Sequence, residues 1–325
     1  MKPQKKQTLN LFKLKSFEDA AAYAAQNFQD AGGIILARNL QHLSAEIFTQ
    51  EFPDLTFLQQ GITINNEGGY ATSIQKLKLQ IAGGFRESGS NTNTNGKITL
   101  VGEQDNIPVY SKEAESDWSE VDLKQAELQG ISLPGRFLEA HVEVYNRDID
   151  AIGYLGQVRT DGTQKTTGLL NYAGWDTAAA AGPASGMTGL DLYNAIAGLI
   201  NRQWALVFNT AAYRANRVIM PDNVYNTASR LILNSAGSEM SVLRALQTNF
   251  PEISFGLTNV ARNVGGSSKT IAFSDNRRAM QFRLPVPLNI SSIHQKGWKY
   301  YVESYFGVGG LDVIENGAAA VLTGL

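Results

Sequence analysis

The most regular apolar pattern in the chain lies in residues 133–156 and predicts a long helix. Its apolar side chains are spaced by four, three, four and three residues, which places them on one stripe of a helix: Leu138, Val142, Tyr145, Ile149 and Ile152. Charged side chains fall on the other faces: Arg136, Glu139, Glu143, Arg147 and Asp150. Ser132 is a suitable N-cap, and Pro134 suits the first turn. We expect a helix of roughly 20 residues, about 30 Å long, that ends near Gly156.

Alternating apolar and polar residues predict two β-strands, one at residues 74–81 and one that begins at residue 98 and is closed by Pro108. Residues 88–96 between them consist of Ser, Thr, Asn and Gly, the composition of a turn. We therefore expect a hairpin whose arms of about 11 residues reach about 35 Å. Two strands alone are only marginally stable. The hairpin is either an ordinary one at the edge of its own sheet or one that rests on another surface.

Shorter patterns of both kinds fill the rest of the chain. Helices are expected at residues 17–28, at 39–52, from the capping pair Thr188 and Asp191 as far as Phe208, and over most of 223–248. Short strands are expected at the following positions: residues 62–64, 218–221, 253–255, 270–273, 280–286 and 298–307. This mixture predicts an α+β fold.

The composition fits a large globular protein with little charge. A chain of 325 residues forms one large domain or two interleaved ones, and 43% apolar residues support a sizeable core. Only 18% of the residues are charged, which suits a subunit that hides surface against neighbours and an ordinary globule almost equally. The net charge of -2 argues against a protein devoted to nucleic-acid binding. Residues 1–15 carry five lysines and no acid, so they form either an arm that touches DNA or a neighbouring subunit, or a solvated tail.

The sequence offers no recognisable catalytic, metal or cofactor site. Cysteine is absent, which excludes disulfides and thiolate chemistry. The histidines stand apart, and the one inside the long helix is expected to be a surface or hydrogen-bonded residue rather than a ligand: His42, His141 and His294. Residues 265–270 have some features of a phosphate loop, but Ser268 precedes the lysine where glycine is required, so we expect a turn between two strands. No signal peptide or membrane-spanning run is expected.

An acidic run occupies residues 113–122. Its carboxylates lie among serines and a lysine: Glu113, Glu115, Asp117, Glu120 and Asp122. Catalytic carboxylate pairs need shielded surroundings that separate their pKa values. We therefore expect a solvated loop here.

Four segments carry a resemblance to a known family: residues 40–58 with the phrase EFPDLTFL, residues 68–110, residues 118–130, and residues 146–156 followed by Gly168-Leu169-Leu170-Asn171. In their order they resemble the major capsid protein of tailed bacteriophages, whose fold is called the Hong Kong-ninety-seven-type fold and is shared with encapsulin shells. The resemblance covers roughly residues 40–325. Residues 68–110 look like the projecting hairpin of that fold, its E-loop, and the later segments look like the approach to, and the end of, its long spine helix.

The resemblance implies an α+β phage capsid fold with an N-terminal arm, an extended E-loop, a long spine helix, and peripheral and axial domains. Residues 1–60 would form the arm and its helices, and residues 61–112 the E-loop. The peripheral domain with the spine helix would comprise residues 113–185 and 280–325, and residues 186–279 would be mainly axial. Many relatives carry a cleaved N-terminal scaffolding segment that does not precede the arm here, so either scaffolding is a separate protein or the numbering begins after maturation.

The resemblance further implies a structural subunit, not an enzyme, that assembles with itself into pentamers and hexamers around double-stranded DNA. Scaffolding and portal proteins would be partners, packaged DNA would make non-specific contacts, and no cofactor or membrane would be involved. The protein would belong to the virion capsid and assemble in the cytoplasm of the bacterial host. Four residues of the E-loop are expected in contacts between subunits: Lys76, Arg86, Glu87 and Lys97. The alternatives are an encapsulin-like nanocompartment and an enzyme with dispersed active-site residues.

Overall fold

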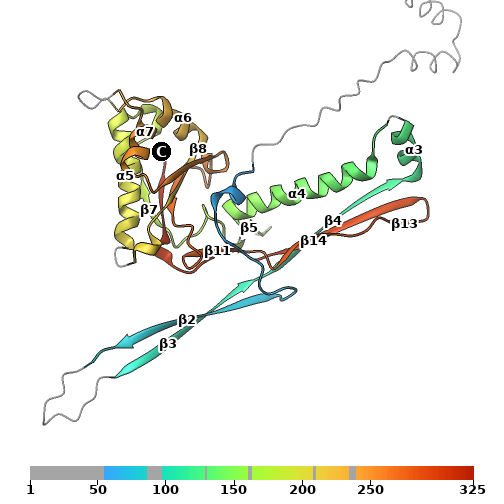
Figure 1. Ribbon diagram of the computed structural model, residues 1–325, viewed down its shortest axis with the longest axis horizontal. Helices are drawn as coiled ribbons and strands as arrows, with labels where there is room; N and C mark the ends of the chain where they lie inside the picture. Colours follow the sequence, from blue (N-terminus) through green and yellow to red (C-terminus); the bar gives the residue numbers. More distant parts are fainter. Residues whose placement is uncertain (1–54, 86–96, 129, 160–162, 208–209, 234–238) are drawn as a thin grey trace, which may run out of the picture. The chain divides into compact units, whose positions relative to one another are not determined.

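A computed structural model describes residues 55–85, 97–128, 130–159, 163–207, 210–233 and 239–325 (Figure 1). They all belong to one compact unit, Pro53–Leu325. Several expectations lie outside the described residues: the basic arm, the helices at residues 17–28 and 39–52, His42, Phe208, and the hairpin tip with Arg86 and Glu87. Within the described residues, no helix is both long and apolar enough to cross a membrane.

A five-stranded sheet separates two hydrophobic cores. Its strands follow the order β7 (Asp176–Ala179), β16 (Ala319–Thr323), β10 (Lys269–Phe273), β8 (Arg217–Pro221) and β9 (Ser254–Thr258). β10 runs antiparallel to β16 and β8, and the two outer strands run parallel to their neighbours. Successive side chains of a strand point to opposite faces. Ile219 therefore enters one core, and Val218 and Met220 enter the other, which explains the continuous apolar run in β8.

Three helices cover one core: α5 (Gly189–Leu206), α6 (Asp222–Arg230) and α7 (Val242–Asn249). The expected cap of α5 is confirmed, because the Thr188 hydroxyl accepts a hydrogen bond from the Asp191 backbone N–H and donates one to the Asp191 carboxylate. Leu192, Ile196 and Ile200 of α5 are fully buried. The strands expected at residues 218–221, 253–255 and 270–273 are confirmed as β8, β9 and β10.

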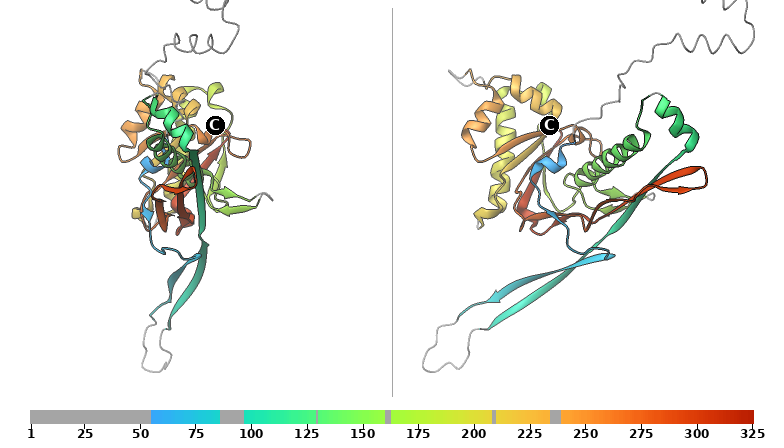
Figure 2. Two further views of the ribbon diagram at one scale, coloured as in Figure 1. Left: turned by 90° about the vertical axis from the view of Figure 1, so that its right-hand side faces the viewer. Right: turned by 45° about the vertical axis from the view of Figure 1, so that its right-hand side comes forward.

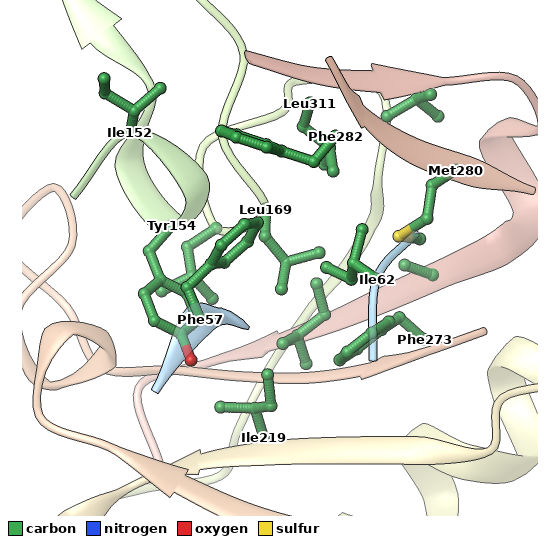
Figure 3. Close-up of a cluster of buried hydrophobic side chains, with 14 of the residues drawn as sticks. Phe57, Ile62, Ile152, Tyr154, Leu169, Ile219, Phe273, Met280, Phe282 and Leu311 are labelled. Carbon is green, nitrogen blue, oxygen red and sulfur yellow. The ribbon is translucent and has the colours of Figure 1, made fainter. Parts of the chain in front are cut away.

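The other core lies beneath the C-terminal end of the long helix (Figure 3). A small sheet contributes to it, made of β1 (Ile64–Asn65), β11 (Met280–Arg283) and β15 (Gly310–Val313). The ring of Phe57, in the short helix η2 (Phe57–Gln60), lies edge-on to Tyr154 at 5.3 Å and to Phe282 at 5.1 Å. A Cβ atom on Gly153 would come within 2.4 Å of the Phe57 ring, so only glycine fits at this helix position.

The long helix is confirmed as α4 (Leu133–Leu155), with 23 residues and Pro134 in its first turn. Ser132 is the N-cap residue, but its side chain makes no capping hydrogen bond. Asp150, one of the charged residues that lie off the apolar stripe, is buried. Its carboxylate accepts a hydrogen bond of 2.8 Å from the Phe57 backbone N–H. The helix end is enclosed on more than its apolar stripe, so a polar side chain there needs a partner inside the protein.

The acidic run is not a loop, which corrects the sequence prediction. It forms β4 (Tyr110–Ser119) and the start of α3 (Glu120–Leu128). β4 pairs with β14 (Lys299–Val308) along its whole length, in a sheet that also contains β12 (Val286–Ile290) and β13 (His294–Lys296). Every second side chain of β4 faces α4, and Trp118 is buried there. Backbone pairing and one covered face outweigh the polar composition of this strand. The strand expected at residues 280–286 is divided into β11 and the start of β12.

The expected hairpin is confirmed as β2 (Ser73–Gly83) and β3 (Ile98–Pro108), with 11 residues in each strand and uninterrupted pairing. Only Val109 separates β3 from β4. In Figure 2, no helix of the described residues lies against either face of this hairpin. It is therefore a two-stranded structure that no helix of the described residues covers.

The remaining described elements are short: β5 (Gln157–Val158), β6 (Gln164–Thr166), η3 (Ala184–Gly186), η4 (Ala211–Tyr213), η5 (Val260–Arg262) and η6 (Asn316–Ala318). The five-stranded sheet joins β7 and β16 with β8, β9 and β10. It thus combines strands from both stretches assigned to the peripheral domain with strands from the stretch assigned mainly to the axial domain. The domain assignment itself stays a prediction.

Candidate functional site

The β2–β3 hairpin carries an exposed apolar face. Directly opposite residues of an antiparallel pair point to the same side, so Ile81 and its partner Leu100 share a face with every second residue on either strand. Five aliphatic side chains, each 57–78% exposed, form this face: Leu77, Leu79, Ile81, Ile98 and Leu100. A Cβ atom on Gly102 would lie 3.5 Å from the ends of the Leu77 and Leu79 side chains, which therefore lean across β3. We call these five side chains the apolar hairpin face. Apolar surface gathered in this way marks an interaction site.

The opposite face of the hairpin is polar. In the strand register, two lysines of β2 lie directly opposite carboxylates of β3: Lys76 opposite Asp105, and Lys78 opposite Glu103. Lys97 is exposed just before Ile98, at the far end of the ladder from the root. Arg86 and Glu87 lie outside the described residues, so the structure places two of the four residues predicted to contact another subunit. It does not bring these two together, and the contacts themselves remain a prediction.

Lys76 reaches into a buried cluster of charges. The side chain of Asp312 in β15 is 0% exposed, and it forms ion pairs with Lys76 and Arg283. The Arg283 guanidinium donates to one Asp312 oxygen from Nε at 3.1 Å and from Nη2 at 3.0 Å, and it also reaches Glu67 at 3.4 Å. Lys76 binds the other Asp312 oxygen and also pairs with Asp105. Its hydrogen bond lowers the pKa of the Asp105 carboxyl. Each buried charge is thereby paired.

Sequence analysis missed Asp312 and Arg283. The one signal was a single carboxylate inside the apolar run at residues 311–314. Such a residue is almost never fully buried unless it is paired. Its partners come from other strands: Arg283 lies 29 positions away and Lys76 lies 236 positions away, and no local pattern encodes either contact.

Helix α4 supports one face of the β4–β14 pair. The Trp118 and Phe137 rings stack at 4.9 Å, and Tyr145 meets Phe306 edge-on at 5.0 Å. His141 is buried, and its Nδ1 shares a hydrogen bond of 2.7 Å with the Ser304 hydroxyl, as expected of a structural histidine. These contacts make a rigid layer of helix on sheet.

The other face of the β4–β14 pair is acidic and exposed. Glu115 lies directly opposite Glu303, and Glu113 lies two residues farther along β4. These three carboxylates form no ion pair within the described part of the chain, whereas Asp117 pairs with Lys299 at 2.8 Å. Like charges directly opposite each other on a sheet are destabilising. This acidic face therefore does not serve the stability of the isolated subunit.

The described residues contain no group of three or more histidine or carboxylate side chains that could hold a metal ion. Gly265 and Gly266 form a turn in the connection between β9 and β10, as expected, with φ values of 67° and 87°, and Lys269 begins β10. Lys269, the lysine of the phosphate-loop-like sequence, donates instead to the Leu170 carbonyl oxygen at 2.7 Å, and burial lowers its pKa. The candidate functional feature is therefore the exposed β2–β3 hairpin, which extends from the layer formed by α4 and the β4–β14 pair.

Comparison with known proteins identifies the family of this chain. The family model described as "Major capsid protein" matches residues 88–325, more than half of the chain. The chain belongs to the major capsid protein family. No curated protein matches the chain.

Solved structures agree with this assignment. The capsid of Myoviridae phage XM1 is 67% identical over 90% of this chain and 100% of that chain, with a TM-score of 0.82. The capsid of a native GTA particle (14% identical, TM-score 0.64) covers 90% of this chain and 97% of its own. Mycobacterium phage Ogopogo (10% identical, TM-score 0.58) covers 89% and 98%, and these two similarities show the fold alone. The phage capsid fold expected from the sequence is confirmed, and so is the function of this capsid protein as a structural subunit of a tailed-phage capsid. The encapsulin-like alternative is not favoured.

Proposed function

We propose that this capsid protein closes a shell of pentamers and hexamers by laying the β2–β3 hairpin of one subunit on the next, and that the shell encloses double-stranded DNA. The apolar hairpin face is the observation that carries the proposal. It consists of five aliphatic side chains that are more than half exposed on a two-stranded ribbon. A ribbon of this kind is only marginally stable without a covering surface. A second copy supplies that surface and leaves the apolar face buried.

The magnitude of this contact favours a repeated assembly over a simple pair. Burying an exposed aliphatic side chain contributes about 1.5–3 kcal/mol, so five side chains, already partly covered, contribute on the order of 5–10 kcal/mol. Association itself costs roughly 4–15 kcal/mol in lost freedom and ordering. One hairpin contact is thus weak alone. Head-to-tail contacts of this kind close into rings, in which every subunit both gives and receives a hairpin.

The residues predicted for the contact fit this arrangement to different degrees. Lys97 stands exposed beside the apolar hairpin face and is available to a neighbour. Lys76 is engaged within its own subunit, with its side chain 13% exposed. We therefore propose Lys97, together with Arg86 and Glu87 near the hairpin tip, as the polar rim of the contact.

The finer features of the proposal concern partners and contents. Scaffolding and portal proteins are proposed to guide assembly in the bacterial cytoplasm, and the subunit is proposed to act without catalysis or cofactor. The net charge of -2 supports a shell wall that holds packaged DNA only loosely, because it presents little net attraction to phosphate. Nuclease-resistant double-stranded DNA in particles from infected cells is the expected result. Particles that contain only protein would contradict it.

Deletion of residues 83–96, closed by a short turn, tests the role of the hairpin. Since β2 ends at Gly83 and β3 begins at Ile98, the deletion removes the tip and the last ladder pair, Gly83 with Ile98, and leaves the other pairs of both strands in place. We expect circular dichroism and thermal melting like those of the intact chain, together with a failure to close shells in sedimentation and negative-stain microscopy. Particles of normal size and yield from the folded deletion variant would show that the tip, with Arg86 and Glu87, is not needed to join subunits.

A further inference from the structure

The side chain of Lys76 joins the hairpin to the body of the subunit through hydrogen bonds and an ion pair. Its ammonium group binds the Asp312 carboxylate, donates to the Val313 carbonyl oxygen at 3.0 Å, and pairs with Asp105 at 3.1 Å. An ammonium group has three hydrogens to donate, and here each has an acceptor. Lys76 lies on β2 and Asp105 directly opposite on β3, while Asp312 and Val313 belong to β15 of another sheet. The contact therefore ties both strands of the hairpin to that sheet.

The Lys76 contact lies near the short link between the hairpin and β4. β4 is fixed by its ladder with β14, and only Val109 lies between β4 and β3. Each residue contributes two soft backbone dihedrals, so a short junction leaves the direction of the hairpin free to change unless another contact restricts it. The Val109 N–H donates to the Thr72 carbonyl oxygen at 2.9 Å, which joins the two strands at the root but leaves their common direction open. Among the described side chains of β2, Lys76 is the one farthest from the root that bonds to a different sheet.

The burial of Asp312 makes the tie specific. Arg283 occupies one carboxylate oxygen and Lys76 the other, so a displaced hairpin would leave a buried oxygen of a charged group without a partner. Buried ion pairs contribute little to stability compared with apolar replacements, and their best-attested role is to select one arrangement over others. An apolar contact at this point would tolerate sliding, whereas this ion pair is satisfied in one position.

We propose that Lys76 is a positioning residue: held by the buried Asp312, it fixes the direction in which the hairpin leaves the subunit, so that the apolar hairpin face meets the next subunit in the alignment that shell closure requires. The inference rests on the proposed function of the hairpin. It gives Lys76 a role inside its own subunit in addition to any contact with a neighbour. The matched comparison is Lys78, two residues farther along the same face, opposite Glu103 and without an ion pair in the described part of the chain.

Distances in the unassembled full-length chain test the inference directly. Because the chain lacks cysteine, two introduced cysteines carry spin labels without background, one at the exposed Thr99 of β3 and one at the exposed Glu143 of α4. We expect a narrow distance distribution in the otherwise unchanged chain and in Lys78→Met. In Lys76→Met we expect a distribution at least twice as broad. The yield of closed shells in the unlabelled proteins should fall at least tenfold for Lys76→Met and stay within about twofold for Lys78→Met.

Two results would overturn the inference: a distribution in Lys76→Met as narrow as in the unchanged chain, or a broad one together with a normal yield of shells. If circular dichroism shows that Lys76→Met does not fold, Lys76→Gln replaces it, because glutamine keeps a hydrogen-bond donor for Asp312 but no charge. The same two outcomes then apply to that variant. A failure of the proposed function is recognised separately, since the unchanged chain would then form no shells while the distances still decide whether Lys76 fixes the hairpin.

Discussion

The subunit contains two long antiparallel ladders, β2–β3 with 11 residues in each strand and β4–β14 with ten, and they are supported in opposite ways. The β4–β14 pair rests on α4, where Trp118 stacks on Phe137. The β2–β3 pair has no such cover and exposes its aliphatic side chains. One ladder is completed within the subunit. The other is complete only when a further surface covers it.

The contrast between the two ladders shows that the sequence pattern of a strand does not always match its burial within the subunit. The sequence KLKLQI of β2 alternates like a strand on a protein core, although its leucines and Ile81 stay exposed among the described residues of the subunit. The sequence YSKEAESDWS of β4 looks like a loop, although it is a half-covered strand. The alternation in β2 therefore agrees with our proposal that another chain covers this face. A polar strand is recognisable only through its partner, which lies far away in the sequence.

The covered ladder should be the more sensitive to loss of a side chain. Trp118→Ala removes a buried ring that stacks on Phe137, so we expect the free energy of unfolding of the unassembled subunit to fall by about 3–5 kcal/mol. Chemical denaturation measures this change. Trp298→Ala is the matched control, because that ring is 77% exposed and its loss should change stability by less than about 0.5 kcal/mol. Equal effects of the two substitutions would remove the contrast between covered and exposed positions.

The uncovered ladder should be sensitive in assembly instead. Ile81→Asp places a charge in the apolar hairpin face, where it costs little in the free subunit because Ile81 is exposed. We expect the yield of shells to fall at least tenfold, with the free energy of unfolding almost unchanged. Val101→Asp, on the opposite face of the same hairpin, should assemble far better. Equal losses for both variants would mean that the apolar face has no special role.

The buried end of α4 predicts a pH dependence. Desolvation raises the pKa of the Asp150 carboxyl, partly opposed by the hydrogen bond from the Phe57 N–H. Since the folded pKa lies above the unfolded value of about 3.9, the folded state binds this proton more tightly, and stability falls as pH rises from that value through the folded pKa. Asp150→Asn keeps an oxygen for the Phe57 N–H but does not titrate. Denaturation of both proteins at a series of pH values should show the variant gaining relative to the unchanged chain over this window. A constant difference would contradict the assignment.

The exposed face of the covered ladder should show the smallest effect. Glu303→Gln removes one of two like charges that lie directly opposite, so we expect the unassembled subunit to gain about 0.2–1 kcal/mol in stability at low ionic strength. High salt should abolish most of this gain, because exposed charges are screened. In combination with Glu115→Gln the gain should be less than additive. A gain that persists in high salt would have another cause.

Sequence patterns predicted the elements that carry their own periodicity. The extent of α4, the hairpin strands and the cap of α5 all follow from local patterns, although Leu138 and Val142 of the expected α4 stripe are exposed. The order of segments indicated the family. Burial of Asp150 and Asp312 could not be predicted in the same way, because η2 and β2 enclose these residues from distant parts of the chain. For the same reason Lys76 was expected at a contact between subunits, whereas its ammonium group binds within its own subunit.

Our central proposal is that another copy of this chain covers the apolar hairpin face in the assembled shell. An electron cryomicroscopy map of closed shells, at a resolution that shows side chains, tests it most directly. We predict that Leu79, Ile81 and Leu100, all more than half exposed in the isolated subunit, are buried against a neighbouring subunit. A shell in which these side chains remain open to solvent would contradict the account.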